Sequence, residues 1–200
     1  MCYNNSRMFI SILIPPFLKV DFKYHIILMD ILHEFGGHAP ILLILLSWYL
    51  LWEHKNLFFY YNVGLLSNAI LNSILKGLIQ EPRPMFDNKK VRLMTAHAKH
   101  YFFQNGIPFD IYGMPSGHAQ MAFFTTAFIY LSLKHTNFLY LYLIISLIIC
   151  YQRVNFGYHS ITQVIVGAIV GSCFAYFVYQ LAREKIKGKI REKLDDDGPI

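Results

Sequence analysis

Hydrophobic and polar residues occupy separate stretches of this 200-residue chain. The long apolar blocks are Ile41–Trp52, Leu57–Leu75, Met121–Leu133, Phe138–Tyr151 and Ile161–Leu181. A helix needs about 20 apolar residues to cross a bilayer, and uncharged flanking residues extend the shorter blocks toward that length. Charged residues fall almost wholly between the blocks, as in polytopic membrane proteins. The pattern predicts an all-α bundle of about five transmembrane helices, with a short interfacial helix at Tyr24–Phe35 before them.

Composition favours this interpretation over a soluble helical bundle. Hydrophobic residues make up 55% of the chain and aromatic residues 16%, which is unusually apolar for a soluble domain. The length and purity of Ile161–Leu181 argue in the same direction. No repeat or linker divides the sequence. We therefore expect a single membrane-embedded domain over residues 1–182 and a basic tail over residues 183–200.

The basic residues indicate how the chain is oriented in the membrane rather than a nucleic-acid partner. The formal charge of +6 is spread over short loops and the tail, so binding to nucleic acid is not expected. The tail places Arg183, Lys185 and Lys187 within reach of the last span, and the positive-inside rule puts such residues in the cytoplasm. If the spans alternate in direction, residues 76–115 and 153–160 then face the lumen or exterior.

Three polar patches lie at that side of the predicted bundle. The first begins with Lys76 at the exit of the second span and continues to Arg83. Asn68 and Asn72 precede Lys76 at intervals of four residues, so the three side chains share one helix face. A polar stripe on a membrane helix is expected to point into the bundle.

The second patch is the sequence Pro115-Ser116-Gly117-His118, at the start of the third span. Free backbone N–H groups and the positive end of the helix dipole make a helix start a suitable site for an anion. His118 falls in the first turn of the helix. We expect it to lie beside any anion bound there.

The third patch joins the last two spans. Arg153 ends one helix, Gly157 permits a tight turn, and His159 and Gln163 lie one helical turn apart at the start of the next. Small residues continue this face of the last span at Gly167, Gly171 and Ala175. They would allow another helix to pack closely behind the histidine.

Together, the patches offer three cations, backbone amides and two histidines, a set that suits phosphate. Phosphoryl transfer depends mainly on positioning and on neutralising the phosphate oxygens, and an arginine can do this with two bonds. One histidine could attack the phosphorus while the other protonates the leaving oxygen.

These motifs resemble those of the type 2 phosphatidic-acid phosphatase superfamily, which includes the vanadium haloperoxidases. Lys-x6-Arg-Pro, Pro-Ser-Gly-His and Arg-x5-His occur here in the family's order, within a motif core at residues 76–163. The resemblance implies a lipid-phosphatase/haloperoxidase-like core and a substrate that is a lipid phosphate or diphosphate among membrane lipids. It implies no cofactor and no metal.

The resemblance also implies roles for single residues. His159 would be the nucleophile that forms a phosphohistidine, and His118 would be the general acid. Gln163 would orient His159. The phosphate would be held by Lys76, Arg83, Ser116, Gly117 and Arg153.

Two positions depart from the superfamily pattern. Gln152 stands where Ser is usual, and Gln163 stands where Asp is usual. An amide oxygen can fix the tautomer of His159 but carries no negative charge to raise its basicity. The residues in and around the motifs, including Gln-Glu-Pro-Arg-Pro and the Gln at 163, resemble those of the dolichyl-diphosphate phosphatase branch. That branch implies a lumenal site in the endoplasmic reticulum and a part in protein N-glycosylation.

Three alternatives stay open at this point. The chain could hydrolyse dolichyl or polyprenyl diphosphate, could act broadly on lipid monoesters of the phosphatidic-acid type, or could bind lipid phosphate without catalysis. A zinc site at His33-Glu34-x3-His38 is not expected, because helical zinc motifs place their histidines four residues apart.

Overall fold

The computed structural model describes residues 16–84 and 112–187, which form five α-helices. The helices are α2 (Pro16–Leu51), α3 (Lys55–Ile79), α6 (Gly117–Leu133), α7 (Thr136–Asn155) and α8 (Ile161–Ile186). Within these residues, four segments are long and apolar enough to cross a membrane: Ile27–Leu51, Lys55–Ile79, Thr136–Asn155 and Ile161–Lys185. The remaining predicted span, the third along the chain, corresponds to α6, which has only 17 residues and lies between the others. The all-α membrane bundle predicted from the sequence is confirmed.

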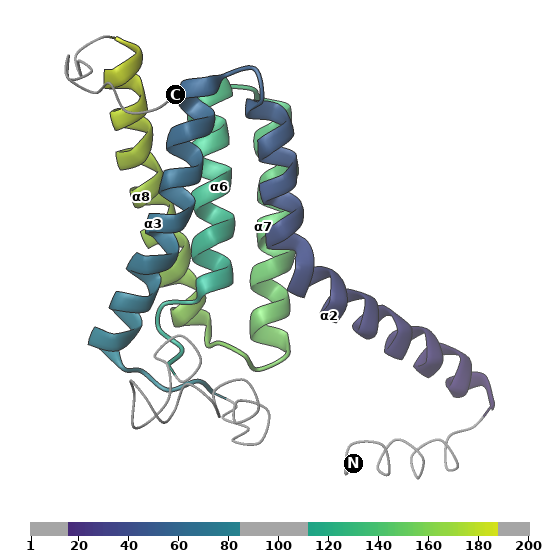
Figure 1. Cartoon of the computed structure of the whole chain (residues 1–200). Coiled ribbons are helices and arrows are strands. Elements are labelled where there is room, and N and C mark those ends of the chain that lie inside the picture. Colours follow the sequence, from purple (N-terminus) through teal and green to yellow (C-terminus); the bar gives the residue numbers. More distant parts are fainter. Residues whose placement is uncertain (1–15, 85–111, 188–200) are drawn as a thin grey trace, which may run out of the picture.

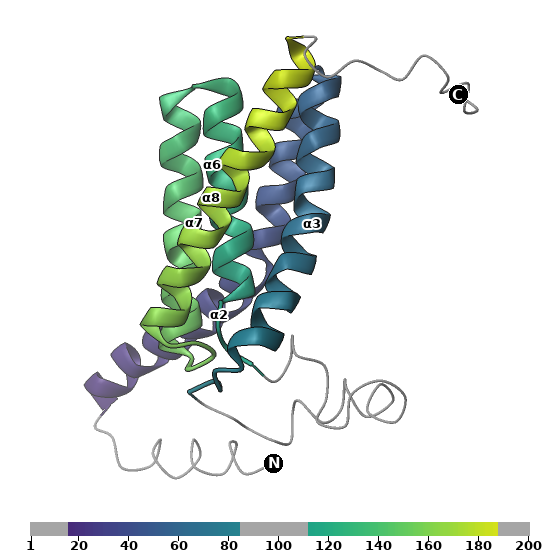
Figure 2. The ribbon, with the colours of Figure 1, turned by 90° about the vertical axis from the view of Figure 1, so that its left-hand side faces the viewer.

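The N-terminal helix differs from the prediction. The expected interfacial helix at Tyr24–Phe35 is not a separate element, because it is continuous with the first span in the 36-residue helix α2. Neither the Gly36-Gly37 pair nor Pro40 ends the helix. The N-terminal part of α2 instead projects away from the other helices at one end of the bundle (Figures 1 and 2).

Apolar side chains cover the outside of the bundle, while polar ones lie within it. Leu66 and Leu78 on α3 are 70% and 74% exposed, whereas Asn68 on the same helix is 1% exposed. Buried hydroxyl pairs also link the helices, including Ser47 with Tyr142 at 3.0 Å and Thr126 with Ser146 at 2.9 Å. This arrangement suits a protein surrounded by lipid, where polar groups must find partners inside.

Helix α6, which carries His118, and helix α8, which begins just after His159, pack most extensively against each other. A methyl group added at Gly167 of α8 would lie 2.6 Å from the carbonyl oxygen of Ser116, and one at Gly171 would overlap the carbonyl oxygen of Gln120. Ala175, one turn further on, is fully buried. The predicted role of these small residues, close packing against another helix, is confirmed.

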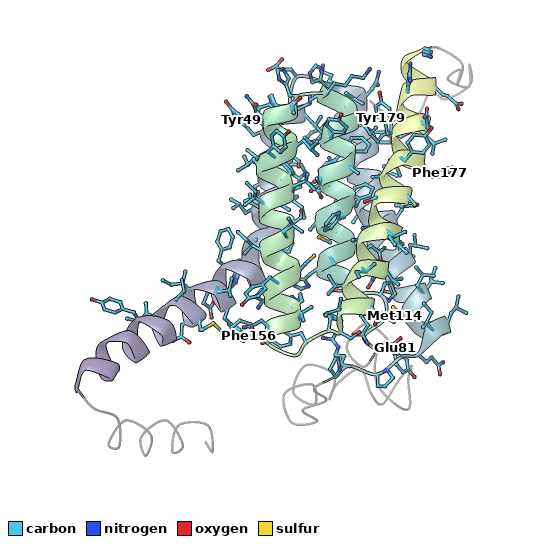
Figure 3. The ribbon with its side chains drawn as sticks, turned by 180° about the vertical axis from the view of Figure 1, so that it is seen from behind. Tyr49, Glu81, Met114, Phe156, Phe177 and Tyr179 are labelled. Carbon is cyan, nitrogen blue, oxygen red and sulfur yellow. The ribbon has the colours of Figure 1, made fainter. Side chains whose placement is uncertain are left out.

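The helices alternate in direction, so the three polar patches meet at one end of the bundle. Figure 3 shows Glu81, Met114 and Phe156 at this end and Tyr49 and Tyr179 at the other. Helix α8 ends at Ile186, at the opposite end of the bundle from the patches (Figure 1). Residues 188–200, most of the predicted basic tail, lie outside the described residues.

Candidate functional site

The first patch forms where α3 ends. Gln80 closes the helix in a left-handed conformation with φ 55°, and Pro82 cannot continue it. The chain then pairs with the segment before α6 through an antiparallel bridge between Pro82 and Tyr112. Lys76, 1% exposed, donates from its Nζ to the carbonyl oxygen of Tyr112 at 2.7 Å. The first patch is thereby joined to the second.

The polar stripe of α3 faces inward as predicted. Asn72, 2% exposed, donates to the carbonyl oxygen of Pro115 at 3.2 Å and to Oε1 of Gln120 at 2.8 Å. Gln120 in turn donates to Oδ1 of Asn68 at 2.8 Å. These buried amides fix the approach of α3 to α6 and hold the carbonyl group just before Ser116.

The second patch begins α6 in the expected way. Ser116 precedes the helix, and its backbone N–H donates to the carbonyl oxygen of Gln163 on α8 at 2.9 Å. Its hydroxyl is fully buried and, among the described residues, has no hydrogen-bond partner. Gly117 and His118 follow in the first turn. A buried hydroxyl without a partner beside free helix amides is a suitable donor set for an anion.

The third patch turns tightly between α7 and α8. Gly157 takes φ 68°, a conformation that favours glycine, and the backbone N–H of His159 donates to the carbonyl oxygen of Arg153 at 3.1 Å. Ser160 caps α8 by accepting from the backbone N–H of Gln163 at 3.2 Å. His159, 3% exposed, is thus fixed just before a capped helix.

Gln163 uses every hydrogen-bonding position of its side-chain amide. Its Nε2 donates to Oε1 of Glu81 at 2.8 Å and to the carbonyl oxygen of Pro82 at 2.9 Å. Its Oε1 lies 3.2 Å from Nδ1 of His159 and accepts from the backbone N–H of Ser160 at 3.2 Å. Both partners of Nε2 are acceptors, so the amide cannot be turned around. Nδ1 of His159 therefore carries the proton, and Nε2 of His159 holds a free electron pair.

Arg153 and Arg83 complete the positive surroundings. The guanidinium carbon of Arg153 lies 4.9 Å from the ring centre of Tyr158, a cation–π contact that holds it in place. Its buried Nε has no hydrogen-bond partner in the parts of the chain described. Arg83, Lys76 and Arg153 all act electrostatically on both His118 and His159. The structure therefore brings every sequence-predicted site residue to one place.

These cations and burial keep both histidines neutral. Burial, and then Arg153, lower the pKa of His118 from 6.5 to about 3, although a hydrogen bond to the backbone of Gly37 opposes the change. Burial, followed by Arg83 and Lys76, lowers the pKa of His159 to about 3, against a raising effect of Gln163. A neutral His159 is the form that can attack phosphorus. His118 needs a proton to act as an acid, and an anion bound among the cations would raise its pKa.

An apolar cavity of about 250 Å³ adjoins His118. It lies between α2, α3 and α6. Its lining residues are Gly37, Pro40, Ile41, Asn68, Ala69, Asn72, Gly117, His118 and Met121. A cavity with mainly apolar walls beside a cluster of cations can hold a hydrocarbon chain whose polar end reaches those cations.

Sequence reasoning missed the contribution of α2. Nε2 of His33 lies 2.8 Å from the hydroxyl group of Tyr158, which stacks on Arg153. Gln152 donates to the carbonyl oxygen of His33 at 3.3 Å and fills the space beside Gly36. The sequence did show that Gln152 stands where the superfamily usually has Ser. It did not show that the partner of Gln152 is His33.

Comparisons with known proteins identify relatives of this chain. The family model described as "PAP2 superfamily" matches residues 57–187. Dolichyldiphosphatase of Saccharomyces cerevisiae is 33% identical over 135 residues, which cover 60% of this chain and 51% of that protein. Dolichyldiphosphatase 1 of Homo sapiens is 31% identical over 134 residues, which cover 58% of this chain and 50% of that protein. The chain spans about half the length of the curated relatives it matches.

A solved structure shares the fold. The transmembrane PAP2-type phosphatidylglycerolphosphate phosphatase of Bacillus subtilis superposes with a TM-score of 0.52 at 17% identity. The superposition covers 96% of this chain and 90% of that one. The likeness therefore includes α2, which lies outside the region that the family model matches.

Proposed function

The chain belongs to the PAP2 superfamily, and on that premise we propose that it is an integral-membrane hydrolase that converts dolichyl or another polyprenyl diphosphate to the monophosphate. One observation carries the proposal. An imidazole with a fixed tautomer, a second imidazole and three cations surround one point beside an apolar cavity. The similarity to dolichyldiphosphatases supports the choice of substrate.

In the proposed reaction, Nε2 of His159 attacks the terminal phosphorus. The bond from this phosphorus to the bridging oxygen breaks, and the lipid monophosphate leaves with a proton from His118 where one is needed. Water then attacks the phosphohistidine and releases inorganic phosphate; its proton goes to His118 if that residue gave up its own, and otherwise to solvent. His159 is regenerated, so the sum is lipid diphosphate plus water giving lipid monophosphate plus phosphate.

The remaining residues hold the phosphate and the nucleophile. Arg83, Arg153 and Lys76 neutralise the oxygens of the transferring group. The hydroxyl group of Ser116 and the backbone N–H of Gly117 donate to them, and Gln163 orients His159. The first carbons of the lipid occupy the cavity beside His118, and residues 1–182 act as a single domain.

Purified protein that contains all 200 residues tests the proposal. In detergent with a chelator present, we expect it to release phosphate from dolichyl diphosphate faster than from phosphatidic acid. The His159→Ala variant serves as the inactive control. Faster release from phosphatidic acid would favour the monoester alternative, and no release from either lipid would favour a non-catalytic binder.

We further propose that the site faces the lumen of the endoplasmic reticulum and that the C-terminus is cytoplasmic. The basic residues at the end of α8 and the similarity to dolichyldiphosphatases support this orientation. A reporter fused after Ile200 should be cytoplasmic, and a tag inserted near Asn88 should be lumenal. The reverse labelling would contradict the orientation and leave the chemistry untouched.

A further inference from the structure

Glu81 occupies a fixed position that the proposed reaction does not yet use. It follows the end of α3, and its backbone carbonyl accepts from Gly113 at 2.7 Å. Its carboxylate accepts from Nε2 of Gln163 at 2.8 Å. The same amide accepts the Nδ1 proton of His159 through its other end. Glu81 is therefore two hydrogen bonds away from the proposed nucleophile, and Figure 3 shows it at the site end of the bundle.

The amide of Gln163 explains why a carboxylate can lie next to it. Gln163 receives hydrogen bonds at its oxygen and donates two at its nitrogen, so it can join an N–H group on one side to a carboxylate on the other. An aspartate at this position could not donate to Glu81, and the two negative charges would repel. In this chain, the Gln163 amide and the Glu81 carboxylate together could therefore do what a single aspartate at position 163 would do.

We propose that Glu81 is a positioning residue that supplies, through the amide of Gln163, the negative charge that supports His159 during phosphoryl transfer. This rests on the function proposed above. Attack on phosphorus makes the imidazole ring more positive, and a polarised hydrogen-bond chain ending in a carboxylate stabilises that charge. The cations Arg83, Lys76 and Arg153 act directly on His159 and oppose a positive charge on its ring.

If the charge of Glu81 acts in this way, removing it should slow catalysis without weakening substrate binding. Glu81→Gln keeps an oxygen that can accept from Gln163 but removes the charge. We expect kcat for dolichyl diphosphate to fall about tenfold, the size expected when a hydrogen bond loses its charge. KM should stay the same or fall, because the site becomes more positive toward an anionic substrate. A role only in folding would instead lower kcat and raise KM together.

The control and the decisive variant both come from this chain. Glu53→Gln removes an equal charge from an exposed position in the turn between α2 and α3, and we expect it to leave kcat and KM unchanged. In a protein that carries Gln163→Asp, the effect of Glu81→Gln on kcat should change sign. In that background Glu81→Gln should raise kcat, because it removes the repulsion between two carboxylates. A fall in kcat in both backgrounds would overturn the proposal.

A measurement that needs no turnover separates this inference from the proposed function. With ¹⁵N-labelled histidine and assignment by His159→Asn, wild-type protein should show a proton on Nδ1 of His159. Glu81→Gln should shift that proton signal upfield, since its hydrogen bond weakens. An unchanged signal would overturn the inference even in an active enzyme. An inactive wild type with the shifted signal would reject the phosphatase function and retain the connection from Glu81 to His159.

Discussion

The surroundings of His159 and His118 differ, although both residues lie at one end of the bundle among the same cations. Side chains hold His159, through Gln163 and then Glu81. His118 instead hydrogen-bonds the backbone of Gly37 on α2 and borders the apolar cavity. The amide that holds His159 thus has all its hydrogen bonds filled, whereas His118 borders a cavity that can take an apolar ligand. The difference fits a nucleophile with one fixed task and an acid that acts next to the leaving lipid.

The largest expected effect comes from removing the nucleophile. His159→Ala should lower turnover of every substrate by at least about a thousandfold, because no phosphoenzyme can form without the imidazole. A ³²P-labelled substrate followed by a search for acid-labile phosphohistidine would check this. If His159→Ala still becomes labelled while His118→Ala does not, the two roles are reversed.

His118→Ala should separate the two kinds of substrate. An alcohol leaving from a monoester needs a proton, so we expect turnover of a lipid monoester to fall by about 10²–10⁴-fold. A lipid monophosphate that leaves from a diphosphate depends less on receiving a proton, because its second pKa is near ~6. Diphosphate turnover should therefore fall less. Equal losses on both substrates would contradict the assignment of His118 as the acid.

The pH dependence should distinguish the same two residues. The pKa of His159 in the free protein is about 3, so its protonation should reduce kcat/KM only as the pH falls toward 3. His118 must be protonated, and bound phosphate should lift its pKa well above its free value of about 3. The rate on a monoester should then decline on the alkaline side. That decline should be absent from His118→Ala.

The shared cations should affect both sides alike. Arg153→Ala should reduce turnover of diphosphate and monoester by a similar factor of about 10²–10³, the usual effect of losing one preorganised donor to the transition state. Arg153→Lys should recover only part, because an ammonium group cannot make two parallel bonds. We expect the same of Arg83→Ala. Near-normal activity of both alanine variants would contradict the proposed phosphate site.

Gly113→Ala should disturb the His159 side alone. A methyl group there would overlap the side-chain amide of Gln163 and displace it from His159. We expect turnover of both substrates to fall by about tenfold, comparable to the loss of one or two buried hydrogen bonds. The ratio of diphosphate to monoester turnover should stay constant. A change in that ratio would show that the perturbation reaches His118.

The smallest effect on turnover should come from a change in the contact between α2 and Gln152. A methyl group at Gly36 would lie 2.5 Å from the side chain of Gln152, and such overpacking costs about 1–3 kcal/mol of stability. Gly36→Ala should therefore lower the melting temperature and reduce monoester turnover more than diphosphate turnover. Gly36→Ala combined with Gln152→Ser should recover stability. For the melting temperature alone, Gly37→Ala is the matched control, because nothing lies within 4 Å of an added methyl group there. Its turnover is not part of the control, because Gly37 lines the cavity beside His118.

Much of the site could be predicted because its groups are tied to local sequence. The fourfold spacing of Asn68, Asn72 and Lys76 fixes one helix face, and all three are buried as expected. Ser116 and His118 begin a helix, and Gly157 makes a turn, whatever surrounds them. The roles assigned to the two histidines and to the phosphate-binding residues stay predictions until the variants above are measured.

The rest was decided by tertiary structure. The sequence determined the membrane-spanning character of the chain and the separate motifs, because hydropathy and helix geometry are local properties. It did not show that Gly36, which follows the expected interfacial helix, lies against Gln152, or that the backbone of Gly37 meets His118. Nor did it show that Glu81 meets Gln163, 82 positions away. Such contacts depend on how the helices pack, and packing is set by the combined shapes of side chains that are distant in the sequence.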